Sequence, residues 1–200
     1  MRNLKIGNRK DRIQLMTKNL ELFRMPKWEH LPDAIRSKEV CTLTNDLLLP
    51  IFPAERELLS PAMLQNYLRW GILPPVDGRK YNREQICWIL TITLLKNVIT
   101  IKEIKKGILL QLKLMEAKEA YNILCEEVER AFSYMSDTIF MWCSSKESED
   151  TLRFDSFDLD PSRLAIGSVC RALAFQIFTQ MALREDGIAE TMEKLAQRSM

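Results

Sequence analysis

The polar residues with the clearest binding chemistry in this chain lie between residues 60 and 82. Gln65, Asn66 and Arg69 are spaced so that one face of a helix presents them. The opposite face carries the apolar residues Met63, Leu64, Tyr67 and Leu68. Amide side chains can form two hydrogen bonds with adenine, whereas arginine and lysine mostly bind phosphate. Because a basic pair, Arg79 and Lys80, follows closely, the stretch predicts contact with duplex DNA.

A short helix must position these residues. Ser60 followed by Pro61 is typical of a helix N-terminus, because serine caps the first turn and proline loses no hydrogen bond there. Gly71 and the Pro74-Pro75 pair then stop the helix. We therefore expect a helix that ends near Trp70.

Further helices should flank this one. Residues 33–49 are compatible with a supporting helix before it. After it, residues 79–81 indicate an extended basic segment, and Asn82 is a typical cap for an apolar helix over residues 83–97. Thr100 then begins a capping box for the next helix.

This order of elements resembles the DNA-binding half of MerR-type transcriptional regulators. The residues that carry the resemblance are Ser60, Pro61, Leu64, Tyr67, Gly71, Leu73, Pro74, Pro75, Arg79 and Tyr81. The stretch resembles still more closely an uncharacterised bacterial family, domain of unknown function 1836, which has MerR-like architecture and no assigned ligand. The resemblance implies a winged helix-turn-helix in the middle of the chain.

Departures from the MerR pattern change the expected contacts. Gln65 stands where those proteins usually carry the recognition arginine, so base preference should move from guanine toward adenine. The segment between Gly71 and Arg79 is shorter than the usual wing, which reduces the expected hairpin to a stub or an extended turn. The spacing of Tyr67 also suits simple burial. The residues predicted to bind DNA are Gln65, Asn66, Tyr67, Arg69, Arg79, Lys80 and Tyr81.

The composition predicts a mainly α protein. Only six glycines and eight mostly clustered prolines favour helix over sheet, and 200 residues suffice for two small domains. We expect a basic N-terminal extension over residues 1–30 and a MerR-like winged helix-turn-helix over residues 31–113. A helical dimerisation or effector region should occupy residues 114–200.

Charge divides the chain into two unlike halves. Residues 1–113 carry 20 Lys and Arg against 11 Asp and Glu, whereas residues 114–200 carry 9 against 16. A basic half with a helix-turn-helix is the electrostatic pattern of a phosphate-binding protein, and Lys102, Lys105 and Lys106 would extend its basic surface. Charge alone is equally compatible with an ordinary solvated face.

The cysteines predict a reduced, metal-free protein. The five widely spaced cysteines in apolar sequence are Cys41, Cys87, Cys125, Cys143 and Cys170. A thiol or metal sensor is the alternative, but the chain has no C-x-x-C pair and only one histidine, His30. We expect no metal and no cofactor. Without a phosphate loop, a nucleophile elbow or a histidine-based constellation, an enzyme is not expected either.

The C-terminal half predicts further helices. Residues 109–141 suit one long helix or two, and Asp160 caps a strongly apolar helix that ends near Leu183. Residues 144–158 should form an exposed acidic loop, and Gly187 precedes a last short helix. MerR proteins dimerise through a long helix at this point in their order, so the resemblance implies a homodimer. Packing within a monomeric bundle is the alternative.

Residues 1–25 are basic and amphipathic, and we expect a short helix packed on the body rather than a free arm or a membrane-surface segment. They lack a signal-peptide pattern, and the chain lacks a long uncharged apolar run. The expected location is therefore the cytoplasm, without membrane association.

Two functions remain open. The first is a sequence-specific transcriptional regulator that binds double-stranded DNA and uses its helical C-terminal region for dimerisation or for sensing an unknown effector. The second is a helical module that keeps the winged-helix architecture but binds protein instead of DNA.

Overall fold

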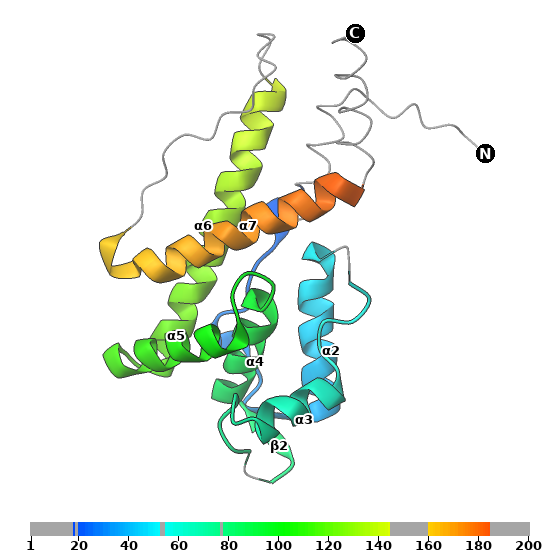
Figure 1. Ribbon diagram of the computed structural model, residues 1–200, viewed down its shortest axis with the longest axis vertical. Coiled ribbons are helices and arrows are strands. Elements are labelled where there is room, and N and C mark those ends of the chain that lie inside the picture. Colours follow the sequence, from blue (N-terminus) through cyan, green and yellow to red (C-terminus); the bar gives the residue numbers. More distant parts are fainter. Residues whose placement is uncertain (1–17, 19, 53–54, 77, 145–159, 185–200) are drawn as a thin grey trace, which may run out of the picture.

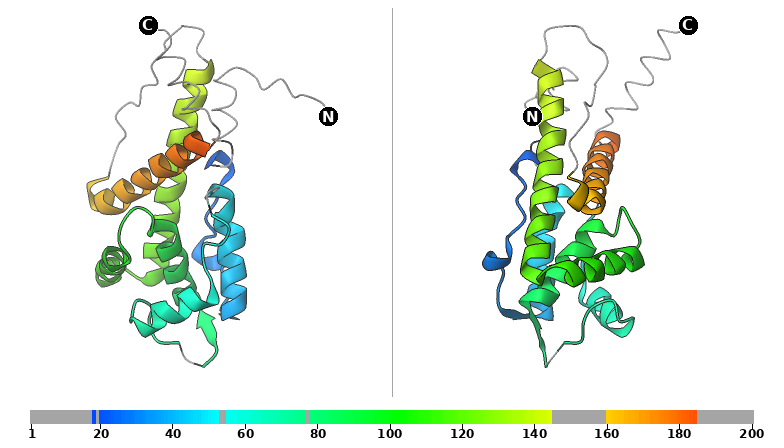
Figure 2. Two further views of the ribbon diagram at one scale, coloured as in Figure 1. Left: turned by 45° about the vertical axis from the view of Figure 1, so that its right-hand side comes forward. Right: turned by 90° about the vertical axis from the view of Figure 1, so that its left-hand side faces the viewer.

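The computed structural model of the chain describes residues 18, 20–52, 55–76, 78–144 and 160–184. These residues form a mainly helical fold with one small two-stranded sheet, which confirms the predicted class (Figure 1). The short helix α3 and strand β2 lie at one end of the molecule, and α7 crosses the long helix α6 nearer the other end (Figures 1 and 2).

The described residues before α3 begin with a 3-10 turn, η1 (Trp28–His30), which is followed by strand β1 (Ala34–Arg36), helix α2 (Ser37–Leu48) and a second 3-10 turn, η2 (Leu49–Ile51). The prediction of a helix from residue 33 is wrong at its start, because residues 34–36 are extended. Ile35 pairs with Tyr81 of β2 (Lys80–Asn82) in an antiparallel register. This pairing joins segments far apart in the sequence, so no local pattern in residues 33–36 reveals it.

The capping signals of the central helices are confirmed. Helix α3 (Pro61–Arg69), helix α4 (Arg83–Leu95) and helix α5 (Ile101–Leu114) begin directly after Ser60, Asn82 and Thr100. Each of these three side chains accepts a hydrogen bond from a backbone N–H in the first turn, which would otherwise have no partner.

Helix α4 is the central pillar of the fold. Every residue from Gln85 to Leu95 is buried, as expected for a helix that is apolar nearly all round. Full burial of one Leu or Ile side chain contributes about 1.5–3 kcal/mol, so α4 supplies much of the apolar driving force for folding. Helices α2, α5, α6 and α7 all contact it.

The C-terminal half contributes two long helices. The stretch predicted as one helix or two is divided: α5 ends at Leu114, Met115 is extended, and α6 (Ala117–Ser144) follows. A 3-10 turn, η3 (Pro161–Arg163), then leads into α7 (Leu164–Arg184), with Asp160 capping the turn as expected.

A buried ion pair helps to hold α7 on α6. The Arg171 guanidinium lies 3.6 Å from the Glu127 carboxylate and donates a 2.9 Å hydrogen bond to the Gly167 carbonyl. Arg163 of η3 lies 3.6 Å from the same carboxylate. Removing Glu127 would leave the Arg171 guanidinium buried without this carboxylate, which is strongly destabilising.

The buried core continues across the expected boundary between residues 113 and 114. It runs from α2 and α4 through Leu124 and Phe132 of α6 to Leu173 and Ile177 of α7. The segment Pro161–Met181, which includes most of α7, is long and apolar enough to span a membrane: its mean hydropathy reaches 1.3 over 18 residues, of which 39% are buried. One such helix is weak evidence for a membrane, because a buried core helix has the same composition. Independence from membranes stays a prediction.

Four of the predicted core cysteines are free and buried: Cys41, Cys87, Cys125 and Cys170. The end of the N-terminal amphipathic stretch packs on the body, where Leu20 is buried and the Phe23 ring lies 5.4 Å from that of Phe132. Several predicted features lie outside the described residues: residues 1–17, the last short helix and the Cys143 side chain. The acidic loop predicted over residues 144–158 also lies outside them, from residue 145 onward.

Candidate nucleic-acid interface

The helix expected to read DNA is fixed at both ends. At its start, the Ser60 hydroxyl accepts a 3.3 Å hydrogen bond from the Met63 amide. At its end, the Gly71 amide donates a hydrogen bond to the Leu68 carbonyl, and the Ile72 amide donates one to the Tyr67 carbonyl. These two hydrogen bonds form a Schellman motif. Gly71 supplies the left-handed residue that this motif requires, with a φ of +62°. The outer face of α3 is therefore presented on a short, rigid helix.

The polar side chains on the outer face of α3 differ in how free they are to form hydrogen bonds with a partner. Gln65 is exposed, and its side-chain amide has no hydrogen-bond partner among the described residues. Asn66 is half-buried, and its side-chain oxygen accepts a hydrogen bond from the exposed Arg69 guanidinium. Gln65 is thus the amide most available for a partner, while Asn66 and Arg69 already satisfy part of each other's bonding capacity.

The two tyrosines of the predicted DNA-binding set lie in the core. Tyr67 is 2% exposed and Tyr81 is 3% exposed. Burial raises the pKa of both phenols, so they stay neutral at physiological pH. In this structure they support the surface from below rather than form it, which agrees with the alternative reading of Tyr67 as a packing residue.

A groove of about 1040 Å³ lies between α3, residues 71–76 and 78–79, and α5. Its polar lining includes Gln65, Arg79, Lys105 and Arg36. Arg36 is the residue that sequence reasoning missed. Once β1 is recognised the signal is clear, because the antiparallel register places the exposed Arg36 directly opposite the exposed Lys80. The small sheet therefore carries basic residues on both strands beside Arg79.

The segment expected to form a reduced wing contributes one strand to the small sheet. Strand β2 pairs with β1, and residues 71–76 and 78–79 form turns and irregular segments, in which Gly78 also has a positive φ of 72°. Gln85 holds this segment in place, because its side-chain amide donates a 2.6 Å hydrogen bond to the Pro75 carbonyl. Lys105 donates to the Gly71 carbonyl from the other side. Both anchors come from buried or packed helices, so the groove has a defined shape.

The connection between α2 and α3 is held by two further side chains. Asn45 accepts hydrogen bonds from the Leu58 and Leu59 amides and donates one to the Leu59 carbonyl. Lys96, at the end of α4, donates a 2.6 Å hydrogen bond to the Leu58 carbonyl. These bonds fix how α3 sits against α2, despite a connection longer than a tight turn.

The comparison with family models decides the family. The model described as Domain of unknown function (DUF1836) matches residues 26–134, which is more than half of the chain. The chain belongs to the DUF1836 family. The match covers β1, β2 and α2 to α5 of this DUF1836 protein, and most of α6. No curated protein and no solved structure is similar enough to count as a match.

The described residues of this DUF1836 protein contain no group of three His, Cys, Asp or Glu side chains placed to hold a metal ion. What the surface around α3 offers is hydrogen bonding from Gln65 and positive charge from Arg36, Arg79 and Lys80. This combination suits a nucleic acid, because positive charge can bind phosphates and an amide can form hydrogen bonds with base edges.

Proposed function

We propose that this protein is a cytoplasmic DNA-binding transcriptional regulator that uses a MerR-like winged helix-turn-helix in residues 31–113. The observation that carries the proposal is the unengaged amide of Gln65 on a short, doubly capped helix, beside a groove that Arg36 and Arg79 also line. In this arrangement α2 supports α3, and the sheet takes the place of the wing.

The residues divide into two roles. Gln65 reads a base edge in the major groove, where an amide pairs best with adenine N6 and N7. Arg36, Arg79 and Lys80 bind phosphates, which fixes the register without specifying sequence. Tyr67 keeps the Gln65 helix seated by packing beneath it.

The first experiment tests phosphate contact in the full chain. Replacing Arg79 and Lys80 by alanine should weaken binding to all duplexes alike and lower the slope of affinity against salt by about 1 for each lost contact. A matched control replaces Lys18 and Arg56, exposed basic residues outside the groove and outside residues 109–200, and removes the same charge. Equal binding by both double variants would place the sheet outside the interface.

The second experiment tests base reading. A selection from random duplexes should return an adenine at one position of each half-site for the parent, and Gln65→Arg should move that preference toward guanine. The substitution should cost the parent site about 1–3 kcal/mol, because each good pair of base contacts is worth that much. An unchanged preference with binding retained would show that α3 does not enter the groove.

We further propose that the protein acts as a homodimer through residues 109–200. Among the described residues, seven of the nine exposed large hydrophobic side chains lie in this part: Leu109, Leu110, Leu114, Phe140, Met141, Leu164 and Leu183. Large exposed apolar side chains of this kind are often buried in contact surfaces. Light scattering at micromolar concentration should give about twice 23.4 kDa. A mass of one chain would remove this part of the proposal.

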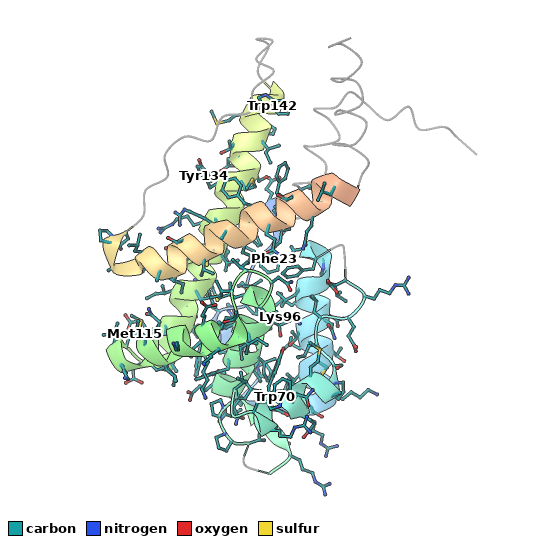
Figure 3. The ribbon with its side chains drawn as sticks, viewed as in Figure 1. Phe23, Trp70, Lys96, Met115, Tyr134 and Trp142 are labelled. Carbon is teal, nitrogen blue, oxygen red and sulfur yellow. The ribbon has the colours of Figure 1, made fainter. Side chains whose placement is uncertain are left out.

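One observation favours the alternative of a protein-binding module. Trp70, at the end of α3 (Figure 3), is 61% exposed. The groove next to α3 is lined by Leu68, Ile72 and Leu73. Exposed tryptophan beside an apolar groove is typical of interaction hot spots. The two functions differ in salt dependence, since affinity that rests on phosphate contacts falls steeply as salt rises.

A further inference from the structure

A second hollow lies behind the DNA-facing groove, where α4, α5, α6 and α7 meet. It is a cavity of about 270 Å³ that is only partly open to solvent. Trp28 of η1 closes one side. Nothing in the proposed DNA contact uses this cavity, so its chemistry needs a separate explanation.

The walls of the cavity are apolar and rich in aromatic rings. Trp28, Trp88 and Tyr121 supply three rings, and aliphatic side chains such as Ile104 and Val169 supply most of the remainder. The Tyr121 hydroxyl is buried beside the Cys125 thiol but makes no hydrogen bond of normal geometry with a described residue. An apolar pocket with a few unsatisfied polar atoms is the usual form of a small-molecule site.

The charge of the lining is one-sided. Glu84 and Glu103 contribute carboxylates, whereas no Lys, Arg or His is among the lining residues. Hydrogen bonds from Thr100 lower the pKa of Glu103, so this carboxylate is ionised at neutral pH. Glu84 is half-buried and has no hydrogen bond or ion pair among the described residues. A positively charged guest would therefore meet two carboxylates and no cationic side chain among the lining residues.

The aromatic walls favour the same guest. The faces of indole rings attract cations, and the Arg83 guanidinium already lies 6.0 Å from the centroid of the Trp28 ring. Trp88 is buried on α4 between the groove and the cavity and lines both.

Gly107 keeps the space open from the α5 side. It lies inside the helix and lines the cavity, and a Cβ added there would meet no atom within 4 Å. Glycine inside a helix lowers stability relative to alanine. The conformation here does not demand glycine, because its φ is not positive. Gly107 is exposed, so the space beside it belongs to the part of the cavity that is open to solvent.

We propose that this cavity binds a small lipophilic cation, an aromatic or alkyl amine or quaternary ammonium ion. The apolar part lies among the aliphatic walls, and the cationic head lies between the aromatic faces and the Glu84 and Glu103 carboxylates. This binding does not depend on the DNA-binding proposal and is tested without DNA.

The test compares three probes of similar size on the full chain. Phenyltrimethylammonium is the cation, tert-butylbenzene is its neutral isostere, and benzenesulfonate is the anion. Binding is followed by calorimetry and by quenching of tryptophan fluorescence. The cation should bind about tenfold more tightly than the neutral isostere, because its head gains the cation–π contact and the attraction of the two carboxylates, and the sulfonate should not bind.

Two kinds of variant separate charge from space. Glu84→Gln with Glu103→Gln should remove the preference for the cation but leave the neutral probe bound, since glutamine still satisfies the capping box at Thr100. Gly107→Leu should abolish binding of both probes by filling the cavity, with Gly107→Ala as the matched control that leaves most of the space. If Gly107→Leu does not fold, Ala120→Leu fills the cavity from α6.

The outcomes decide the proposal. Equal binding of the cation and its isostere to the parent would overturn the assignment of charge. Undiminished cation binding to a folded, cavity-filled variant would overturn the location. Failure of the folded parent to bind either probe would overturn the site itself, while leaving the DNA-binding proposal untouched.

Discussion

Asn45 provides the sharpest test of how α3 is held in place. Its side chain makes three hydrogen bonds, of 2.8, 2.8 and 3.0 Å, to the backbone of Leu58 and Leu59. Both leucines are buried, so their amides have little access to water if Asn45 is lost. Asn45→Ala removes all three bonds at once and leaves two donors and one acceptor without their partner.

The expected cost follows from the number of bonds. A typical hydrogen bond contributes about 0.5–1.5 kcal/mol net, and an unsatisfied buried group costs about 1–3 kcal/mol. Asn45 is half-buried, so water will restore part of the loss. We expect Asn45→Ala to lower the free energy of unfolding by about 3 kcal/mol. Asn45→Asp keeps the acceptor for both amides and loses only the donor, so its cost should be about 1–2 kcal/mol.

Urea unfolding of the full chain measures these differences as shifts of the midpoint at an unchanged m value. Asp46→Ala, at the exposed next position, is the matched control and should change stability by no more than about 0.5 kcal/mol. The reasoning is refuted if Asn45→Ala costs no more than this control. DNA affinity of Asn45→Ala, measured where the variant is still folded, should fall as well, because α3 loses its anchor to α2.

Three further predictions address other parts of the fold. Gly107→Ala should raise the free energy of unfolding by about 0.5–1 kcal/mol, since the new methyl group meets open space; a loss of stability in urea would contradict this. Burial raises the pKa of Cys125 to about 12 and raises that of Cys87 and Cys170 further. Because the thiolate is the reactive form, iodoacetamide at neutral pH should leave all three unmodified until the chain is unfolded, as peptide mass spectrometry can show. Arg163 and then Lys27 lower the pKa of Glu126 in the folded state, so the carboxylate contributes stability above its unfolded pKa that is lost as the pH falls. The stability difference between the parent and Glu126→Gln should therefore be constant above about pH 5 and shrink below it, and a constant difference down to pH 3 would contradict the pairing.

The elements that sequence reasoning predicted well are those with local signals. Ser60, Asn82 and Thr100 begin helices through bonds to residues three positions away, so their role is visible in any short window of sequence. The uniform burial of α4 follows in the same way from its unbroken apolar composition. Gln65 was predicted to point outward from its spacing alone, and it is exposed.

The features that sequence reasoning missed depend on distant contacts. Strand β1 exists because it pairs with β2, and Ile35 fits the spacing of a helix as well as that of a strand. Arg36 could not join the candidate site until that pairing was known. Tyr67 and Tyr81 match the motif of a DNA-binding family, but a motif does not distinguish a residue that touches the ligand from one that supports the surface. The cavity needs four helices to be placed together before it exists at all.

The groove and the cavity share a wall, because Glu84, Trp88 and Leu112 line both. Shared residues make the two hollows subject to thermodynamic linkage: a guest in the cavity that changes DNA affinity by some factor has its own affinity changed by DNA by the same factor. Trp88 is buried and lies on α4, which contacts α2, α5, α6 and α7. A titration of one ligand at two fixed concentrations of the other would therefore measure the coupling free energy from either side and give the same value.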